Sequence, residues 1–205
     1  TGVDALAISY GTMHGASKGK DVKLRKQIPT AIRECLNHEG IRGGLVSHGS
    51  STVPKYIVDE INALGGNIQN AYGISLAELK EAITCGINKI NVDTDIRLAV
   101  TRNMKELFAG CPELRESPSI GGVYQLLENN KDQFDPRVFL PPVMDTVMYG
   151  NIPDGDVARL MECVEKGVKE AVGTLIVQFG AYGKAPLVKR PSLEEMKEYY
   201  KNEGK

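Results

Sequence analysis

The chain has 205 residues, of which 41% are hydrophobic and 25% are charged, a composition typical of a globular domain with a buried core. Its 25 Lys and Arg balance 26 Asp and Glu, so no excess of basic charge predicts binding to nucleic acid or to an anionic membrane. No apolar segment approaches the roughly 20 residues of a membrane span. Residues 1–20 do not have the pattern of a signal peptide.

The four cysteines indicate the redox environment of the protein. Cys35, Cys85, Cys111 and Cys163 are far apart in the sequence and form no CxxC motif. This spacing favours reduced thiols over a disulfide framework or a zinc ribbon. We therefore expect a cytoplasmic protein.

The first half of the chain alternates strand patterns with helical ones. Val3–Ser9 is largely apolar and predicts a strand, which leads into the glycine-rich loop Tyr10–Gly19. Ile28–Asn37 places its apolar residues on one face and predicts a helix. Leu45–Ser47 is a short apolar run and predicts a second strand, which ends at His48.

The same alternation continues beyond the second strand. The apolar spacing predicts another helix from Pro54, and Ser75 followed three residues later by Glu78 predicts a capping box that opens a third helix. A strand is expected at Ile87–Val92 and a helix over residues 96–108. Strands separated by helices predict right-handed crossovers and an α/β fold with a parallel sheet, of which three strands form only a part.

Beyond Pro112 the patterns are helical to the end of the chain. The expected helices are Ile120–Asn129, Pro141–Tyr149, Asp156–Gln178 and a last helix capped by Ser192 with Glu195, separated by the loop Asp132–Phe139 and the connector Gly180–Arg190. We interpret residues 1–205 as one domain, with the strands and their helices in 1–110 and a helical extension in 111–205. Because Thr1 is not a methionine and almost adjoins a strand, we expect a segment of a longer protein.

Two of the three histidines follow predicted strands directly. His14 and His48 each precede a glycine, which would let a substrate approach the backbone, and the carboxyl ends of parallel strands form the active face of such folds. Each could be an ordinary loop histidine, but their matched context favours a pair of metal ligands. His38 lies in a polar helix end, where a solvated histidine is favoured by the helix dipole.

Two turns after consecutive strands are candidate phosphate sites. Gly49-Ser50-Ser51 and Asn91-Val92-Asp93-Thr94-Asp95 would each present backbone N–H groups at the start of a helix. The alternative for both is simple helix capping, because Ser, Thr and Asp are also the best caps. Two such turns beside a histidine favour the phosphate interpretation.

Two lysines are weaker candidates. Lys18 follows His14 by four residues and could close over a phosphate, or it could be a solvated loop lysine. Lys89 lies inside a predicted strand, so a Schiff-base amine has to be considered. Its neighbours give no consistent inward face, and a structural lysine is therefore favoured there.

These residues resemble a known family. The chain looks like the carboxyl-terminal half of a class II, zinc-dependent fructose-bisphosphate aldolase, and the resemblance covers nearly the whole sequence from Val3. The matching motifs occur in family order and are Gly11-Thr12-Met13-His14-Gly15 with Lys18, His48-Gly49-Ser50-Ser51, Lys89-Ile90-Asn91-Val92-Asp93-Thr94-Asp95 and Phe134-Asp135-Pro136-Arg137-Val138.

The resemblance implies a (β/α)8 TIM barrel of which this chain holds strands six to eight and the carboxyl-terminal helices. It implies that His14 and His48 are two of three histidine ligands to Zn2+, and that Arg137 binds the second phosphate in a neighbouring subunit's site. The protein would then be a homodimer or homotetramer. The residues implied to hold the dihydroxyacetone phosphate portion, beside a monovalent cation (Na+ or K+), are Gly15, Lys18, Gly49, Ser51, Asn91, Asp93 and Thr94.

The implied activity is the aldol cleavage of fructose 1,6-bisphosphate in glycolysis, and its reversal in gluconeogenesis. The family's third histidine and its adjacent aspartate acid/base come from an earlier strand, and no Asp-His pair occurs in this sequence. We therefore expect the catalytic aspartate in an amino-terminal half that this chain lacks, and no activity from the 205-residue chain alone. Tagatose-bisphosphate cleavage and a non-catalytic phosphosugar-binding or assembly module remain alternatives.

Overall fold

The computed structural model describes residues 3–14, 19–150 and 155–202. Its sheet contains the parallel strands β1 (Ala5–Ala7), β2 (Gly44–Ser47) and β3 (Lys89–Ile90), in the order β1-β2-β3. Leu6 pairs with Leu45, and Val46 pairs with Lys89. The predicted parallel sheet is confirmed, although β1 and β3 are shorter than predicted at both ends, whereas β2 begins one residue earlier than predicted. Within the described residues, β1 and β3 each pair along one side only, so they are the two edge strands of this sheet.

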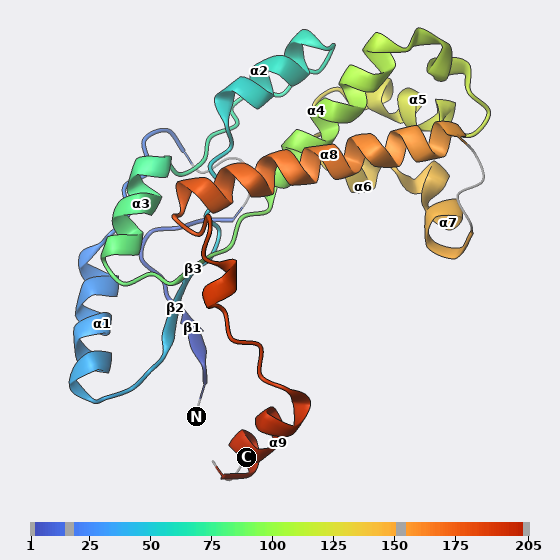
Figure 1. The fold of residues 1–205 in the computed structure, drawn as a ribbon. Coiled ribbons are helices and arrows are strands. Elements are labelled where there is room, and N and C mark those ends of the chain that lie inside the picture. Colours follow the sequence, from blue (N-terminus) through green and yellow to red (C-terminus); the bar gives the residue numbers. More distant parts are fainter. Residues whose placement is uncertain (1–2, 15–18, 151–154, 203–205) are drawn as a thin grey trace.

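Two helices cover one side of this sheet. They are α1 (Gln27–His38) and α3 (Leu76–Thr84), which lie beside the strands in Figure 1. Leu45 of β2 packs with Leu79 and Ala82 of α3 in one apolar cluster, and the apolar face of α1 packs against the same cluster. The apolar residues of α1 and α3 are spaced so that they lie on one side of each helix, and this side packs against the sheet. His38 is exposed in the last turn of α1, as predicted.

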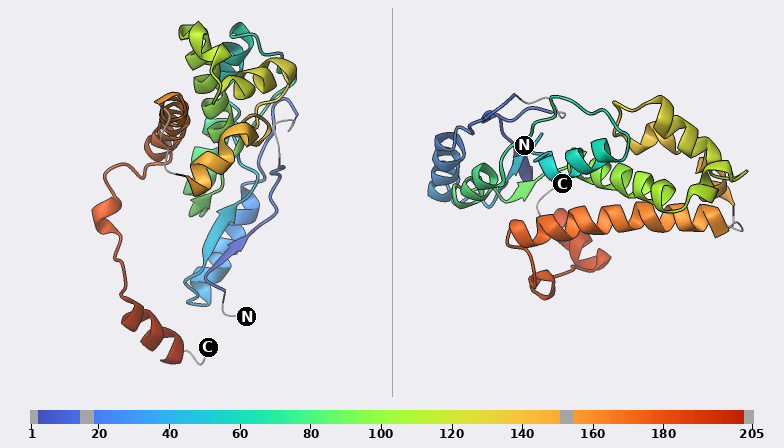
Figure 2. Two further views of the ribbon diagram at one scale, coloured as in Figure 1. Left: turned by 90° about the vertical axis from the view of Figure 1, so that its right-hand side faces the viewer. Right: turned by 90° about the horizontal axis from the view of Figure 1, so that it is seen from above.

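A second cluster joins α2 (Lys55–Ala63), α4 (Thr94–Gly110) and α8 (Gly155–Gln178). The helices α4 and α8 run side by side, which Figure 2 shows from above. They approach closely at Gly167, where a Cβ atom would lie 2.7 Å from the Cα atom of Val100. A glycine at this point lets the two backbones meet, so α8 packs closely against α4.

The far end of α4 carries the third cluster, which contains Phe108, Leu127 and Leu160 among its buried residues. Its helices are η1 (Pro112–Glu116), α5 (Gly121–Asn129), α6 (Pro136–Phe139) and α7 (Pro141–Tyr149). The loop predicted over Asp132–Phe139 is wrong for its second half, because α6 forms there. The Asp135 side chain accepts the backbone N–H of Arg137, and Pro136 occupies a first-turn position that needs no donor.

The two predicted capping boxes differ. Ser192 and Glu195 form the complete reciprocal pair at the start of α9 (Leu193–Asn202), with donor–acceptor distances of 2.6 and 3.2 Å. Ser75 accepts the backbone N–H of Glu78, but the Glu78 carboxylate turns away to accept the backbone N–H of Leu24 at 2.9 Å. That bond is the main cause of its lowered pKa. The half-formed box at α3 therefore anchors the loop that follows β1.

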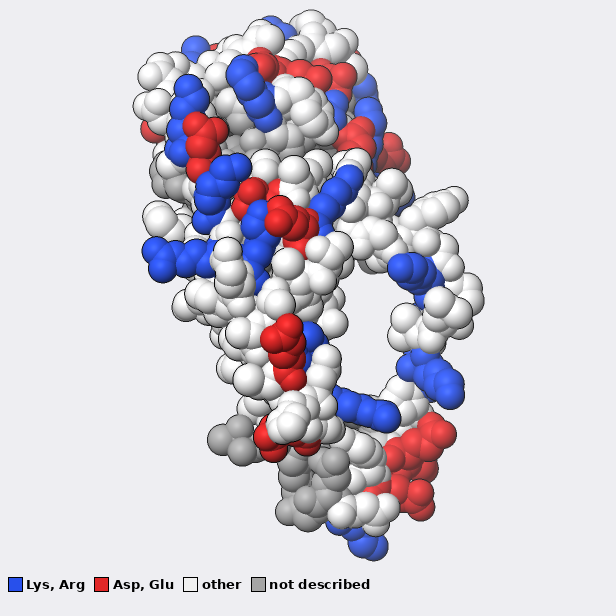
Figure 3. All heavy atoms as spheres, turned by 90° about the vertical axis from the view of Figure 1, so that its left-hand side faces the viewer, with Lys and Arg blue, Asp and Glu red and all other residues white. Residues whose placement is uncertain are grey.

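The chain ends in an exposed arm. From residue 180 onward, through η2 (Ala185–Leu187) and α9, every described residue is exposed, and the arm runs away from the helices (Figure 2). The face drawn in Figure 3 shows an opening between this arm and the rest of the molecule, and its acidic and basic side chains are interspersed. None of the helices described is both long enough and apolar enough to cross a bilayer.

One buried charge stands out in α4. The side chain of Lys105 is 3% exposed, and within the described residues its Nζ atom has no hydrogen-bond partner. The nearest carboxylate oxygen, of Glu128, is 4.0 Å away, and Glu128 also pairs with Lys131 at 3.5 Å. Burial lowers the pKa of Lys105. This lysine therefore destabilises the fold at neutral pH.

We predict that Lys105→Met stabilises the protein by about 1–2 kcal/mol, because a similar volume is filled without a buried charge. The pKa of Lys105 is lowered in the folded protein and has its ordinary value of 10.5 in the unfolded chain. At pH values between these two, the unfolded wild-type protein therefore binds more protons than the folded one. Wild-type stability therefore rises with pH in that window, and the variant should lose this rise. Urea denaturation at several pH values measures both effects. Lys131→Met, at a half-exposed lysine, is the control, and an equal gain there would contradict the explanation.

Candidate functional site

The carboxyl ends of the three strands meet at one pocket of about 440 Å³. Most of the predicted site residues line it, whereas Gly15 and Lys18 lie outside the described residues. Lys89 is exposed and is not among the lining residues, in agreement with the structural interpretation of that lysine. The lining residues are His14, His48, Gly49, Ser51, Ile90, Asn91, Val92, Asp93 and Thr94.

The two histidines lie next to each other. The ring centroids of His14 and His48 are 5.4 Å apart, and the ring planes are inclined at 48°. Two imidazoles on one tetrahedral zinc ion, with Zn–N distances of about 2.0 Å, have centroids about 5 Å apart. The pair therefore fits a shared zinc ion. Within the described residues, no third His, Cys, Asp or Glu joins them to complete a metal site.

Asn91 orients the ring of His48. Its side-chain Nδ2 atom is 3.0 Å from His48 Nε2, so the amide group fixes the orientation of the ring through this nitrogen. Asn91 is itself held between two strand ends, because its N–H donates to the carbonyl of Ser47 and its carbonyl accepts from the N–H of Ser50. A partner on the second ring nitrogen selects the tautomer and orientation of a metal-binding histidine. Asn91 is therefore placed to act on His48.

Gly49 brings the two histidine-bearing segments together. Its φ is +61°, and a Cβ atom there would lie 2.7 Å from the carbonyl carbon and oxygen of Met13 and 3.0 Å from the backbone nitrogen of His14. The sequence suggested that this glycine makes room for a substrate. In the structure the space is filled by the Met13–His14 peptide, so the glycine allows His14 to approach His48.

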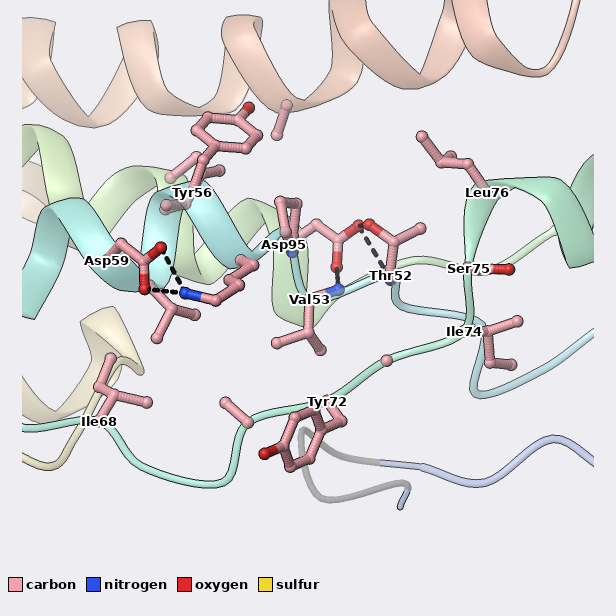
Figure 4. Close-up of a pocket in the computed structure, with 18 of the residues that line it drawn as sticks. Thr52, Val53, Tyr56, Asp59, Ile68, Tyr72, Ile74, Ser75, Leu76 and Asp95 are labelled. Carbon is pink, nitrogen blue, oxygen red and sulfur yellow. Dashed lines mark hydrogen bonds and ion pairs between the residues drawn. The ribbon is translucent and has the colours of Figure 1, made fainter. Parts of the chain in front are cut away.

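The turns after β2 and β3 cap each other. The Ser51 hydroxyl accepts the backbone N–H groups of Asp93 and Thr94, at 3.2 and 3.1 Å. In return the Asp95 carboxylate accepts the backbone N–H groups of Thr52 and Val53, at 3.1 and 2.9 Å (Figure 4). These hydrogen bonds are helix caps, which is the alternative to phosphate binding that the sequence left open for both turns. Asp95 was seen in the sequence only as part of the turn, and its role across two strands required the tertiary structure.

Asp95 also supports a strained residue. Val53 has a φ of +49°, a region that is costly for a β-branched residue. The hydrogen bond to Asp95 and the burial of the Val53 side chain in the cluster of α2 and α4 hold it there. This conformation turns the chain from the end of β2 into α2.

A buried hydroxyl network lies beneath His48. The Tyr10 hydroxyl contacts the Ser47 hydroxyl, which lies 2.6 Å from the Ser50 hydroxyl, and Ser50 donates to the His48 carbonyl at 3.3 Å. Tyr10, Ser47 and Ser50 are almost fully buried, and burial raises the pKa of Tyr10. The network joins β1 and β2 below the pocket. No spacing in the sequence indicated it.

Arg137 lies outside the pocket but is connected to it by alternating charges. Its exposed guanidinium binds the Asp135 carboxylate, with Nη2 at 2.6 Å from Oδ2. Asp135 also binds Arg97, and Arg97 Nε donates to Asp93 at 2.8 Å. The hydrogen bond from Arg137 is the main cause of the lowered pKa of Asp135. This row of side chains links α6 to the turn after β3.

A larger pocket, of about 720 Å³, includes neither histidine. It lies between α2, α8 and the segment 68–76, on the other side of the Asp95 turn (Figure 4). Its lining is largely apolar and includes Tyr56, Tyr72 and Leu76. The strand-end pocket contains the imidazoles and the polar turns, so it is the candidate site.

We predict that Gly49→Ala weakens metal binding at the histidine pair, because the new Cβ would push His14 away from His48. Gly40→Ala is the matched control, since Gly40 has a φ of +69° but a Cβ there would meet nothing within 4 Å. Both variants should lose about 1–2 kcal/mol from the left-handed backbone. Only Gly49→Ala should also lose zinc affinity in a competition titration, and equal zinc affinities would contradict the assignment.

Comparison with known proteins places the chain in a family. The profile of the class II fructose-bisphosphate aldolases matches residues 1–184. Over 98% of the chain, it is 35% identical to a fructose-bisphosphate aldolase of Giardia intestinalis and 32% identical to one of Xanthobacter flavus. The alignments cover 49% and 45% of those two proteins, so the chain spans about half the length of the curated relatives it matches. The chain belongs to the class II fructose-bisphosphate aldolase family.

Proposed function

We propose that the enzyme containing this chain cleaves fructose 1,6-bisphosphate reversibly into dihydroxyacetone phosphate and glyceraldehyde 3-phosphate, in glycolysis and gluconeogenesis. The observation that carries the proposal is the histidine pair, 5.4 Å apart at the carboxyl ends of parallel strands. Polar turns adjoin it in the same pocket, and the chain is a member of the aldolase family. We further propose a (β/α)8 barrel with β1–β3 as strands six to eight in residues 1–110, followed by a helical extension in 111–205.

His14 and His48 would hold Zn2+, with Asn91 orienting His48. When bound, zinc polarises the substrate carbonyl and stabilises the negative charge that develops as the C3–C4 bond breaks. If Nδ1 of His48 held the metal, the ring proton would lie on Nε2, and Asn91 would accept it with its side-chain oxygen once the amide had turned to exchange its oxygen and nitrogen positions. The third histidine ligand and the aspartate acid/base would come from a part of the enzyme outside this chain.

The strand-end turns would bind the dihydroxyacetone phosphate portion, with Ser51 both capping α4 through its hydroxyl and lining the pocket, and so position the reacting carbons beside the histidines. Their position around one pocket supports this proposal. A monovalent cation, Na+ or K+, would sit nearby. The proposed contacts are Gly49, Ser51, Asn91, Asp93 and Thr94, together with Gly15 and Lys18, which lie outside the described residues.

Arg137 would bind the second phosphate in the site of a neighbouring subunit, which requires a homodimer or homotetramer. Its exposed guanidinium supports this role, because it is accessible to a second molecule. Asp135 accepts hydrogen bonds from Nε and Nη2 of Arg137, so the orientation of the guanidinium is restricted before a phosphate binds.

The unpaired cysteines of the described residues agree with the proposed cytoplasmic location.

We predict that His48→Ala abolishes both zinc binding and cleavage in the enzyme containing this chain. Zinc content by mass spectrometry and a coupled cleavage assay are the measurements. His38→Ala, at the exposed helix-end histidine, should retain both. Wild-type turnover in the His48 variant would overturn the metal assignment. Assays with fructose and tagatose bisphosphates in parallel determine which sugar is preferred, and zinc binding without cleavage of either would favour a binding module.

We predict that Arg137→Ala raises the Michaelis constant for the bisphosphate by at least about tenfold, since a charge-assisted contact contributes about 1.5–3 kcal/mol. The melting temperature should stay near that of the wild type, because the guanidinium is exposed. Arg190→Ala, at an exposed arginine of the arm, is the control. An unchanged Michaelis constant for Arg137→Ala would contradict the phosphate role.

A further inference from the structure

The chain that carries His14 leaves the sheet region at Tyr10 and returns to it at Leu24. Both of these residues are buried in the apolar cluster that covers one side of the sheet, with exposed fractions of 1% and 5%. A hydrogen bond joins the outgoing and returning chains, because the N–H of Arg25 donates to the carbonyl of Tyr10 at 2.8 Å. The position of His14 therefore depends on how this base is held.

Glu78 of α3 binds the returning chain at this base. One of its carboxylate oxygens accepts the backbone N–H of Leu24 at 2.9 Å. The other accepts from the side chains of Lys26 and Lys23, at 3.2 and 3.4 Å. The Glu78 side chain is only 9% exposed, so these charge-assisted hydrogen bonds are largely shielded from water. We refer to these three hydrogen bonds as the Glu78 clamp.

The start of α3 is itself attached to the turn that follows His48. The N–H of Ile74 donates to the carbonyl of Ser51 at 3.1 Å. At Gly73 a Cβ atom would lie 2.2 Å from the carbonyl carbon and oxygen of Thr52, so the two backbones are in direct contact. The helix that provides the clamp is therefore fixed relative to the second histidine.

We propose that Glu78 is a positioning residue for the histidine pair, which ties the chain after β1 to α3 so that His14 stays beside His48. The missing side chain of Gly49 makes room for this approach, whereas the Glu78 carboxylate supplies bonds that maintain it. The effect of the clamp on metal binding rests on the proposed function. The hydrogen bonds of the clamp do not depend on it.

The first test follows the histidine ring signals by NMR in the purified protein that contains this chain, after metal removal with EDTA. The signals are assigned from His14→Gln and His38→Gln variants. Glu78→Ala should shift or broaden the signals of His14 and leave those of His38 unchanged. Glu81→Ala is the matched control, because Glu81 lies on the same helix and also binds Lys26, but through an exposed side chain. Unchanged His14 signals in Glu78→Ala, or equal changes at His14 and His38, would overturn the proposal.

Limited digestion with trypsin measures the clamp without using the histidines. Cleavage after Lys23 requires this part of the chain to come away from α3. Glu78→Ala should therefore raise the cleavage rate by at least about tenfold, the ratio expected for the loss of a hydrogen bond to a charged group. Glu78→Gln keeps one oxygen for the N–H of Leu24, so it should remain folded and give an intermediate rate. Equal rates in the wild type and in Glu78→Gln would contradict the clamp even where Glu78→Ala does not fold.

A zinc competition titration connects the clamp to the proposed function. Glu78→Ala should weaken zinc binding by at least about tenfold, as expected when a residue that orients a metal ligand is removed, and Glu81→Ala should not. Unchanged zinc affinity together with altered His14 signals would support the clamp and contradict His14 as a zinc ligand. Unchanged His14 signals and an unchanged digestion rate would overturn the clamp and leave the proposed function intact.

Discussion

The reciprocal capping between Ser51 and Asp95 holds this structure together. The Ser51 hydroxyl, which follows β2, accepts two N–H groups at the start of α4. The Asp95 carboxylate, in the first turn of α4, accepts two N–H groups from the turn after β2. Buried backbone donors must be paired, so the two connections can only be satisfied together. Because α2, α8 and α5 all pack on α4, these bonds position both the helical core and the pocket.

The polar groups at the strand ends divide into two sets. One set maintains the backbone: the Ser51 and Asp95 caps and the Tyr10-Ser47 network are turned inward and buried. The other set faces the pocket and includes His14 and His48, both of which are exposed. Exposed imidazoles at the ends of a hydrogen-bonded scaffold have the arrangement that the proposed metal ion would need. Because Gly49 has no side chain, the backbone of His14 can approach that of His48, and the two imidazoles lie next to each other.

The helical extension is connected to the pocket as well as to the core. The row of charges from Asp93 through Arg97 and Asp135 to Arg137 crosses from the turn after β3 to α6. At the other end of α4, the contact between Arg159 and Cys111 connects α8 to the same unit. A change in how α5, α6 and α7 sit against α4 would therefore move Arg137 relative to the strand ends.

The sequence alone determined most of the element types and the parallel sheet, and it predicted that the two strand-end histidines lie at one edge of that sheet. Apolar periodicity marks the longer helices, and His14 and His48 follow strands whose carboxyl ends must meet at one edge of a parallel sheet. Short elements such as α6 escape this reasoning, because a single turn has no period and depends on the Asp135 cap. Only the tertiary structure decided which polar atoms are used internally, that Glu78 leaves its capping box for Leu24, and that Gly49 serves the backbone. The physical reason is that these partners lie far apart in the chain, and spacing along a sequence carries no record of contacts between distant segments.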